Sequence, residues 1–320
     1  MYSLKLASLA TVPLLWLLAS SGLSAETLPL PTPDTQWVGE VRIVEVGEED
    51  TLMDIARAQG VGYEEIRRAN PHLDIWLPGV GNPVTIPSSF LLPDAPRDGI
   101  VLNRGEMRLY YFHTAPETGE PQVTTYPVGI GRADRQTPTG QSRITMKMHN
   151  PAWYPTENVR ADYASRGKEL PRTIPPGPDN PLGEYAMMLD IPGYLIHGTN
   201  RPDGIGMRVS QGCVRLYPEN IESLVEQVPL QTPVVIVDQP IKVALVGGSL
   251  MAEVHPSVYG GEEETAFDRE RELIRRISDV LTERRDELEG TVDWEWVTEV
   301  AKRADGMPYV ISRKPASPPE

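Results

Sequence analysis

Residues 197–216 read HGTNRPDGIGMRVSQGCVRL and contain Cys213, the one cysteine of this 320-residue chain. A single cysteine cannot form an internal disulfide, and the glycines around it let the backbone approach a substrate closely. An unpaired thiol in such a segment indicates nucleophilic chemistry. The alternative is a small buried apolar side chain, which is how many free cysteines behave.

The residues around Cys213 can serve the chemistry of a thiol. A thiol attacks a carbonyl only as a thiolate, so it needs a base or a cation close by. His197, 16 residues upstream, is the candidate base, because imidazole can take a proton and later return it. Backbone N–H groups of the turn Gln211-Gly212-Cys213 can stabilise a developing oxyanion. Arg215 can pair with a carboxylate, either of the substrate or of the protein.

Residues 1–25 have the features of a secretory signal peptide. Lys5 precedes the apolar residues 6–19, which are short for a membrane span, and Ser24-Ala25 offers small residues for cleavage. An uncleaved membrane anchor is the alternative. Export would place Cys213 in an oxidising compartment, where structural cysteines come in pairs. We therefore expect a periplasmic protein that has no membrane span after signal cleavage and keeps its thiol for a function.

Composition narrows the possible partners. The chain carries a net charge of −15, and only residues 98–237, with 13 basic and 15 acidic residues, are near neutral. Such an acidic protein is a poor partner for nucleic acid or for an anionic membrane surface. The chain has neither a His-Glu-x-x-His nor a Cys-x-x-Cys motif, so we expect no metal and no cofactor.

The N-terminal part predicts a linker followed by a small module. Residues 26–40 are proline-rich and polar, which is typical of a linker. Residues 41–90 then predict the order β-α-α-β, and the predicted elements are a strand at 41–46, helices at 52–57 and 63–69, and a strand at 83–87. Asp50-Thr51 can cap the first of these helices.

This module resembles a LysM module. The residues that carry the resemblance are Glu49-Asp-Thr-Leu52, Ile55-Ala56, Ile66, Ala69-Asn-Pro71 and Val84-Thr-Ile-Pro87. Glu49 stands where such modules usually have glycine. LysM modules bind N-acetylglucosamine glycans, so the resemblance implies a peptidoglycan-binding module over residues 41–90. A structural cap on the next domain is the alternative.

Residues 97–238 predict a mostly-β domain. Strands are expected at 99–103, 107–112, 123–130, 186–189, 194–197 and 234–237, and one amphipathic helix at 218–227. The proline-rich residues 150–183 predict a long ordered loop, and such a loop is often a lid or a wall of a site.

Within this domain, His197-Gly-Thr199 and Ser210-Gln-Gly-Cys-Val-Arg-Leu216 resemble the signature of L,D-transpeptidases of the YkuD type. The LysM-bearing ErfK/YbiS/YcfS/YnhG group is the most similar. Further matching segments are Leu91-Leu-Pro-Asp-Ala-Pro-Arg97, Arg108-Leu-Tyr-Tyr111, Thr137-Pro-Thr-Gly140, Gly177-Pro-Asp-Asn-Pro-Leu-Gly183 and Gly204-Ile-Gly-Met-Arg-Val209. Many family members have histidine where Gln211 stands, which affects substrate or oxyanion contacts but not the proposed base.

The resemblance implies a β-sandwich-like fold and a two-step acyl transfer. The acyl donor would be the diaminopimelate–D-Ala bond of a tetrapeptide stem, which forms a thioester. An amine would then take the acyl group: diaminopimelate in a 3→3 cross-link, or the C-terminal Lys of an outer-membrane lipoprotein. The resemblance implies that Cys213 is the nucleophile and that His197 is first the base and then the acid, oriented by the carbonyl of Gly198. The N–H groups of Gly212 and Cys213 would be the oxyanion donors. Ser210, Gln211 and Arg215 would contact the turn or the substrate.

Two other functions fit the same residues. In an L,D-carboxypeptidase or a lipoprotein-releasing cysteine peptidase, water would resolve the same thioester. A glycan-binding wall protein with an inert second domain is the alternative without catalysis. The C-terminal extension, residues 239–320, predicts helices at 262–289 and 294–304, which either pack on the catalytic domain or form a partner-binding arm.

Overall fold

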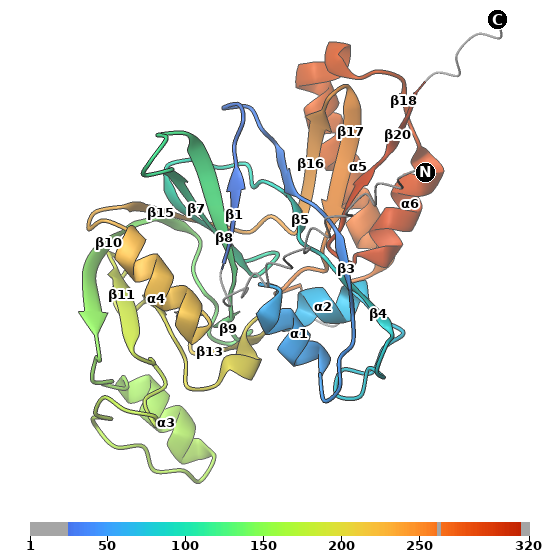
Figure 1. Cartoon of the computed structure of the whole chain (residues 1–320). Helices are drawn as coiled ribbons and strands as arrows, with labels where there is room; N and C mark the ends of the chain where they lie inside the picture. Colours follow the sequence, from blue (N-terminus) through green and yellow to red (C-terminus); the bar gives the residue numbers. More distant parts are fainter. Residues whose placement is uncertain (1–24, 261–263, 315–320) are drawn as a thin grey trace, which may run out of the picture.

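The computed structural model describes residues 25–260 and 264–314. The predicted signal peptide therefore lies outside the described residues, apart from Ala25. Within these two ranges, the structure has no helix that is both long enough and apolar enough to span a bilayer. Figure 1 shows three parts packed together: the N-terminal module in blue, a curled sheet in green and yellow, and a C-terminal unit in orange and red.

A nine-stranded sheet forms the middle of the molecule, in the order β1-β8-β7-β6-β15-β10-β11-β12-β14. Its strands are β1 (Glu26–Pro29), β6 (Gly99–Asn103), β7 (Arg108–Thr114), β8 (Pro121–Pro127), β10 (Gly140–His149), β11 (Tyr185–Leu189), β12 (Leu195–His197), β14 (Val214–Arg215) and β15 (Pro233–Val237). Strand β10 pairs first with β15 and then with β11, with a register shift between Ile144 and Met146. This irregularity bends the sheet around one apolar core, so the predicted mostly-β class is confirmed.

Short elements complete this domain. Helix α4 (Pro218–Gln227) lies where the sequence predicts it and packs Ile221 and Leu224 into the core. The strands β9 (Ile130–Gly131) and β13 (Arg208–Ser210) pair in parallel, and a 3-10 turn spans Pro202–Gly204. The proline-rich segment at 150–183 is ordered and contains α3 (Glu157–Ser165), a helix that the sequence did not predict.

Residues 26–40 are not a linker, and this prediction is wrong. Strand β1 pairs with β8 at the edge of the large sheet, and β2 (Trp37–Gly39) pairs with β5 (Ser89–Leu91). Leu28, Leu30 and Val38 pack into an apolar cluster with Tyr110 and Phe112. An edge strand tolerates proline because one side of it makes no ladder hydrogen bonds, so the proline content misled the prediction.

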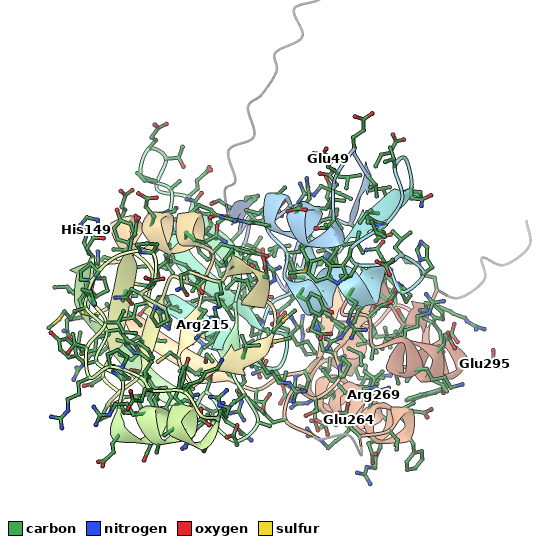
Figure 2. All side chains as sticks on the ribbon, turned by 90° about the horizontal axis from the view of Figure 1, so that it is seen from below. Glu49, His149, Arg215, Glu264, Arg269 and Glu295 are labelled. Atoms are coloured by element: carbon green, nitrogen blue, oxygen red, sulfur yellow. The ribbon has the colours of Figure 1, made fainter. Side chains whose placement is uncertain are left out.

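The N-terminal module has the predicted β-α-α-β order. It consists of β3 (Arg42–Glu45), α1 (Leu52–Ala58), α2 (Tyr63–Ala69) and β4 (Pro83–Ile86), with β3 and β4 antiparallel. Thr51 caps α1 by accepting the N–H of Asp54. Glu49, labelled in Figure 2, has a φ of 67°. This is the left-handed region, which explains why related modules usually have glycine at this position.

A buried ion pair fixes this module to the large sheet. Nε and Nη2 of Arg108 on β7 donate to the two carboxylate oxygens of Glu65 on α2, each at 2.8 Å. The Arg108 side chain is 1 % exposed and also bonds the Thr125 hydroxyl and lies over the Phe90 ring. Because both charges are buried, each depends on the other for compensation.

The C-terminal extension is a mixed α/β unit. It contains the predicted helices, which are α5 (Ala266–Arg284) and α6 (Trp294–Arg303), and a 3-10 turn at Arg285–Glu287. It also contains the strands β16 (Ile241–Val246), β17 (Ser249–Val254), β18 (Thr291–Val292), β19 (Pro308–Val310) and β20 (Ser312–Arg313), which the sequence did not predict. Helices and strands share one apolar core that includes Leu250, Leu273 and Val300.

Buried charges join this unit to the rest of the chain. Lys242 Nζ lies 2.7 Å from a carboxylate oxygen of Glu106 and 2.7 Å from one of Glu253. His255 Nε2 lies 2.8 Å from Glu253, and the other Glu253 oxygen accepts the Leu91 N–H. The Lys242 ammonium thus occupies the centre of this acidic group. His255 is a buried member of this polar network.

The Arg108–Glu65 pair yields a prediction about stability. Glu65→Gln keeps the shape of the side chain but leaves the Arg108 charge buried without compensation, so we expect the free energy of unfolding to fall by about 3 kcal/mol or more. Urea denaturation measures the change. Asp190→Asn breaks the exposed pair with Arg143 and should cost less than about 1 kcal/mol. Equal, small losses in both variants would contradict this role of the buried pair.

Candidate active site

The parallel pairing of β12 with β14 brings the predicted site residues together. Ile196 pairs with Val214, and His197 pairs with Arg215. Paired residues of neighbouring strands share a face of the sheet, as do alternate residues of one strand. His197, Cys213 and Arg215 therefore project to the same side, where they line one cavity of about 450 Å³. His197 and Cys213 are 16 residues apart in the sequence, and the pairing of β12 with β14 brings them onto neighbouring parts of the sheet.

His197 is a buried and oriented imidazole. Its side chain is 3 % exposed, and Nδ1 lies 2.7 Å from the carbonyl oxygen of Gly198. A carbonyl only accepts hydrogen bonds, so Nδ1 carries the proton, and in the neutral ring Nε2 is the nitrogen with the lone pair. Burial, and next the positive charge of Arg215, lower the pKa of His197 to about 3. The imidazole is therefore neutral at physiological pH and can accept a proton.

Cys213 is half-buried in the same cavity. Its Sγ lies 3.7 Å from the Gly193 carbonyl oxygen. Burial raises the pKa of the thiol, while a hydrogen bond with the Leu195 backbone and the charge of Arg215 oppose the rise. In the resting state the cavity thus contains a protonated thiol and a neutral imidazole, and Cys213 must lose its proton before its sulfur can attack a carbonyl.

Hydrogen bonds hold the turn before Cys213. Ser210 Oγ accepts the Gly212 N–H at 3.0 Å and donates to the Cys213 carbonyl at 2.5 Å. Thr137 Oγ donates to the Gly212 carbonyl at 2.8 Å. Gly212 has a φ of 113°, and a Cβ there would lie 2.9 Å from the Tyr194 ring, so the turn requires glycine. The Gly212 N–H, which the sequence resemblance implies as an oxyanion donor, is thus hydrogen-bonded to Ser210 in this structure.

Arg215 is a half-buried cation without a local counter-charge. Its Nε atom is buried and has no hydrogen-bond partner, and Arg215 forms no ion pair within residues 25–260 and 264–314. Burial lowers the pKa of Arg215, but a guanidinium keeps its charge at physiological pH. Figure 2 shows Arg215 near the middle of the molecule, away from the C-terminal unit. The sequence allowed two partners for Arg215, a carboxylate of the substrate or one of the protein. Among the described residues, no protein carboxylate forms an ion pair with it.

The segment at 150–183 forms one wall of the cavity, as the sequence predicted. Trp153 and Tyr163 line it, and α3 is held in place by Asp162 rather than by apolar burial. The carboxylate of Asp162 accepts from Arg132 at 2.8 Å and from Gln211 Nε2 at 2.9 Å. The hydrogen bond from Arg132 lowers the pKa of Asp162 to about 2. Gln211 thus connects the cysteine turn to this wall.

Sequence reasoning missed several residues of the site. Asp162, Tyr163 and Trp153 belong to no motif, so no local pattern identifies them. Thr137 was available in the segment Thr137-Pro-Thr-Gly140, but its hydrogen bond to the Gly212 carbonyl joins residues 75 apart in sequence. Such a contact becomes visible only in the fold.

Comparisons with known proteins match two parts of the chain to protein families. Residues 97–236 match the family described as the L,D-transpeptidase catalytic domain, and residues 44–87 match the LysM domain. The chain is 39 % identical to a protein of Salmonella typhimurium named probable L,D-transpeptidase ErfK/SrfK, over 94 % of this chain and 96 % of that one. It is 40 % identical to the probable L,D-transpeptidase YcfS of Escherichia coli, over 92 % and 91 %. It is 41 % identical to the probable L,D-transpeptidase YbiS of Escherichia coli, over 72 % and 76 %.

The raised pKa of Cys213 predicts its reactivity. Fewer thiols are ionised at a given pH, so the rate of alkylation by iodoacetamide should rise with pH through a higher midpoint than in urea-unfolded protein. Arg215→Met should raise the midpoint further, because a favourable positive charge is lost, whereas Arg143→Met at an exposed site should not. Labelling followed by mass spectrometry reports on this thiol alone. A folded-state midpoint below the unfolded one would contradict the assignment.

Proposed function

We propose that this chain, which belongs to the L,D-transpeptidase family, uses Cys213 as nucleophile and His197 as general base in acyl transfer on peptidoglycan. The family and its LysM module make the chain an enzyme, a transferase, that binds peptidoglycan. The observation that carries the assignment of roles is the shared face of β12 and β14, with the His197 Nδ1 proton committed to the Gly198 carbonyl.

The proposed acylation starts with proton transfer. His197 Nε2 removes the thiol proton as Cys213 Sγ attacks the carbonyl carbon of the diaminopimelate–D-Ala bond. The C–N bond then breaks, His197 returns the proton to the leaving amine, and D-Ala departs, leaving a thioester on Cys213. In the second step an amine attacks the thioester, His197 takes the amine proton, and the proton returns to the sulfur as the new amide forms.

Two contacts support substrate binding in this cavity. The half-buried Arg215 lacks a carboxylate partner among the described residues, which suits it to a carboxylate of the stem peptide. We assign the Cys213 N–H, from the same turn, as an oxyanion donor. Ser210 acts on the turn and not on the substrate, since its hydroxyl already bonds Gly212 and Cys213.

We propose an amine as the acyl acceptor, supplied by the C-terminal Lys of an outer-membrane lipoprotein or by a second diaminopimelate. Transfer to either requires export, so the proposal includes a cleaved signal peptide at residues 1–25 and a periplasmic location. Hydrolysis is the competing outcome, as in an L,D-carboxypeptidase or a lipoprotein-releasing peptidase. A glycan-binding protein with an inert second domain has no use for a neutral, oriented His197 beside a thiol.

The roles of the two residues can be tested on a disaccharide-tetrapeptide. Cys213→Ala should abolish the release of D-Ala, because no other residue of the chain offers a thiol. His197→Gln should lower kcat/KM by about 10²–10⁴, the usual contribution of a general base. His113→Gln, on β7 and outside the cavity, is the matched control and should keep full activity. Wild-type turnover by either site variant would contradict the assignment.

The acceptor can be tested with competing substrates. The enzyme is supplied with a disaccharide-tetrapeptide donor together with a peptide that ends in lysine, and the products are identified by mass spectrometry. We expect D-Ala release accompanied by a new amide, either to the lysine peptide or to a second stem. If the tripeptide formed by water is the sole product under all conditions, the enzyme is a hydrolase and the acceptor proposal is wrong.

A further inference from the structure

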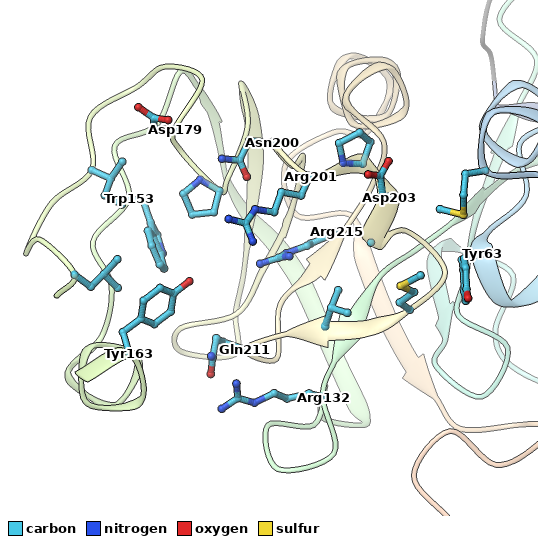
Figure 3. A pocket seen from close by; sticks show the side chains of 18 of the residues that line it. Tyr63, Arg132, Trp153, Tyr163, Asp179, Asn200, Arg201, Asp203, Gln211 and Arg215 are labelled. Carbon is cyan, nitrogen blue, oxygen red and sulfur yellow. The ribbon is translucent and has the colours of Figure 1, made fainter. Parts of the chain in front are cut away.

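The cavity of Cys213 adjoins a second, larger one. This second cavity, of about 740 Å³, shares Trp153, Tyr163, Pro181, Gln211 and Arg215 with the first. Because five residues line both, the two cavities lie side by side, and together they are called the groove below. In Figure 3, Arg201 and Arg215 lie between the wall that bears Trp153 and Tyr163 and the opposite side, where Tyr63 lies.

The far end of this groove belongs to the LysM module. Met53 of α1, Tyr63 of α2 and Trp76 of the loop between α2 and β4 line it together with residues of the catalytic domain. Trp76 is 60 % exposed, although tryptophan is usually buried. Its loop is ordered, because Asp74 accepts the backbone N–H groups of Trp76 and Leu77. The groove therefore offers an exposed aromatic ring on a fixed support.

Contacts between the two modules keep the groove in one shape. The N–H of Tyr63 donates to the Ile205 carbonyl at 3.0 Å, next to the point where Gly62 touches Gly206. A Cβ on Gly62 would lie 2.8 Å from the Gly206 Cα, so the backbones are in direct contact. Farther along the interface, Arg57 on α1 donates two hydrogen bonds of 2.8 Å to the carboxylate of Glu219 at the start of α4.

Together with the buried Arg108–Glu65 pair, these contacts between the two modules hold the LysM module rigidly against the catalytic domain. A module on a flexible tether would lack such contacts.

The chemistry of the lining changes along the groove. The LysM end presents the aromatic and thioether side chains of Trp76, Tyr63 and Met53, which suit the apolar faces of sugar rings. The middle presents the cations Arg201 and Arg215, which suit carboxylates of a peptide. The end away from the LysM module holds Cys213. A glycan bearing an acidic peptide has this same order of groups.

We propose that one peptidoglycan strand occupies the whole groove: its glycan lies against Trp76, Tyr63 and Met53, and its own stem peptide passes Arg215 to reach Cys213. The LysM module is then part of the substrate site and makes the enzyme selective for glycan-linked stems over free ones. This inference rests on the proposed role of Cys213 as the nucleophile.

The test compares two donors: a strand of two disaccharides with tetrapeptide stems, and the free tetrapeptide. Trp76→Ala should raise KM for the strand by about three- to tenfold, the range for one aromatic contact, and leave kcat unchanged. KM for the free tetrapeptide should not change. Leu77→Ala is the matched control, because Leu77 is 83 % exposed, adjacent and outside the groove lining.

Two results would overturn the inference: an unchanged KM for the strand in Trp76→Ala, or an equal rise in KM for both donors. The unfolding midpoint of Trp76→Ala should equal that of the parent protein, since the ring is exposed. The comparison of KM between the two donors requires only that the enzyme turns them over, whichever residue is the nucleophile. Residual activity of Cys213→Ala would thus refute the proposed function separately from the groove.

Discussion

The parallel pairing of β12 with β14 is the constraint on which the site depends. This two-residue ladder sets His197 beside Arg215 and turns both, with Cys213, toward one cavity. Apolar packing holds the ladder, because Ile196 and Val214 point to the opposite side, into the main core. Two hydrogen bonds fix the turn that precedes β14: Ser210 accepts the N–H of Gly212, and Thr137 donates to the Gly212 carbonyl.

Electrostatics follow from this geometry. Placing the Arg215 guanidinium next to a buried imidazole favours the neutral form of His197, while the same charge favours the thiolate of Cys213. Burial opposes thiolate formation more strongly, so the resting pair is uncharged. In the mechanism proposed above, charges would separate only once a substrate carbonyl is in place, and the hydrogen bond from Nδ1 to Gly198 would leave Nε2 to accept the proton.

Sequence patterns predicted the motif residues and the elements with regular apolar spacing, such as α1, α2, α4, β6 and β12. They missed β10 because, of its ten residues, Ile144 alone is fully buried, so it shows no apolar alternation. They missed α3 because it buries no residue and depends on Asp162. Strands β16 and β17 form a nearly continuous apolar run, which does not distinguish strand from helix. The Lys242 network joins residues more than 130 positions apart.

In the proposed mechanism Cys213 carries the acyl group. The direct test is intact-protein mass spectrometry, followed by peptide mapping, of the enzyme mixed with a tetrapeptide donor whose diaminopimelate side-chain amine is acetylated, so that no acceptor amine is present. We expect a hydroxylamine-labile adduct, with the mass of the donor without D-Ala, on the peptide that contains Cys213. Release of D-Ala with no adduct on Cys213 at any time, or an adduct on another residue, would contradict it.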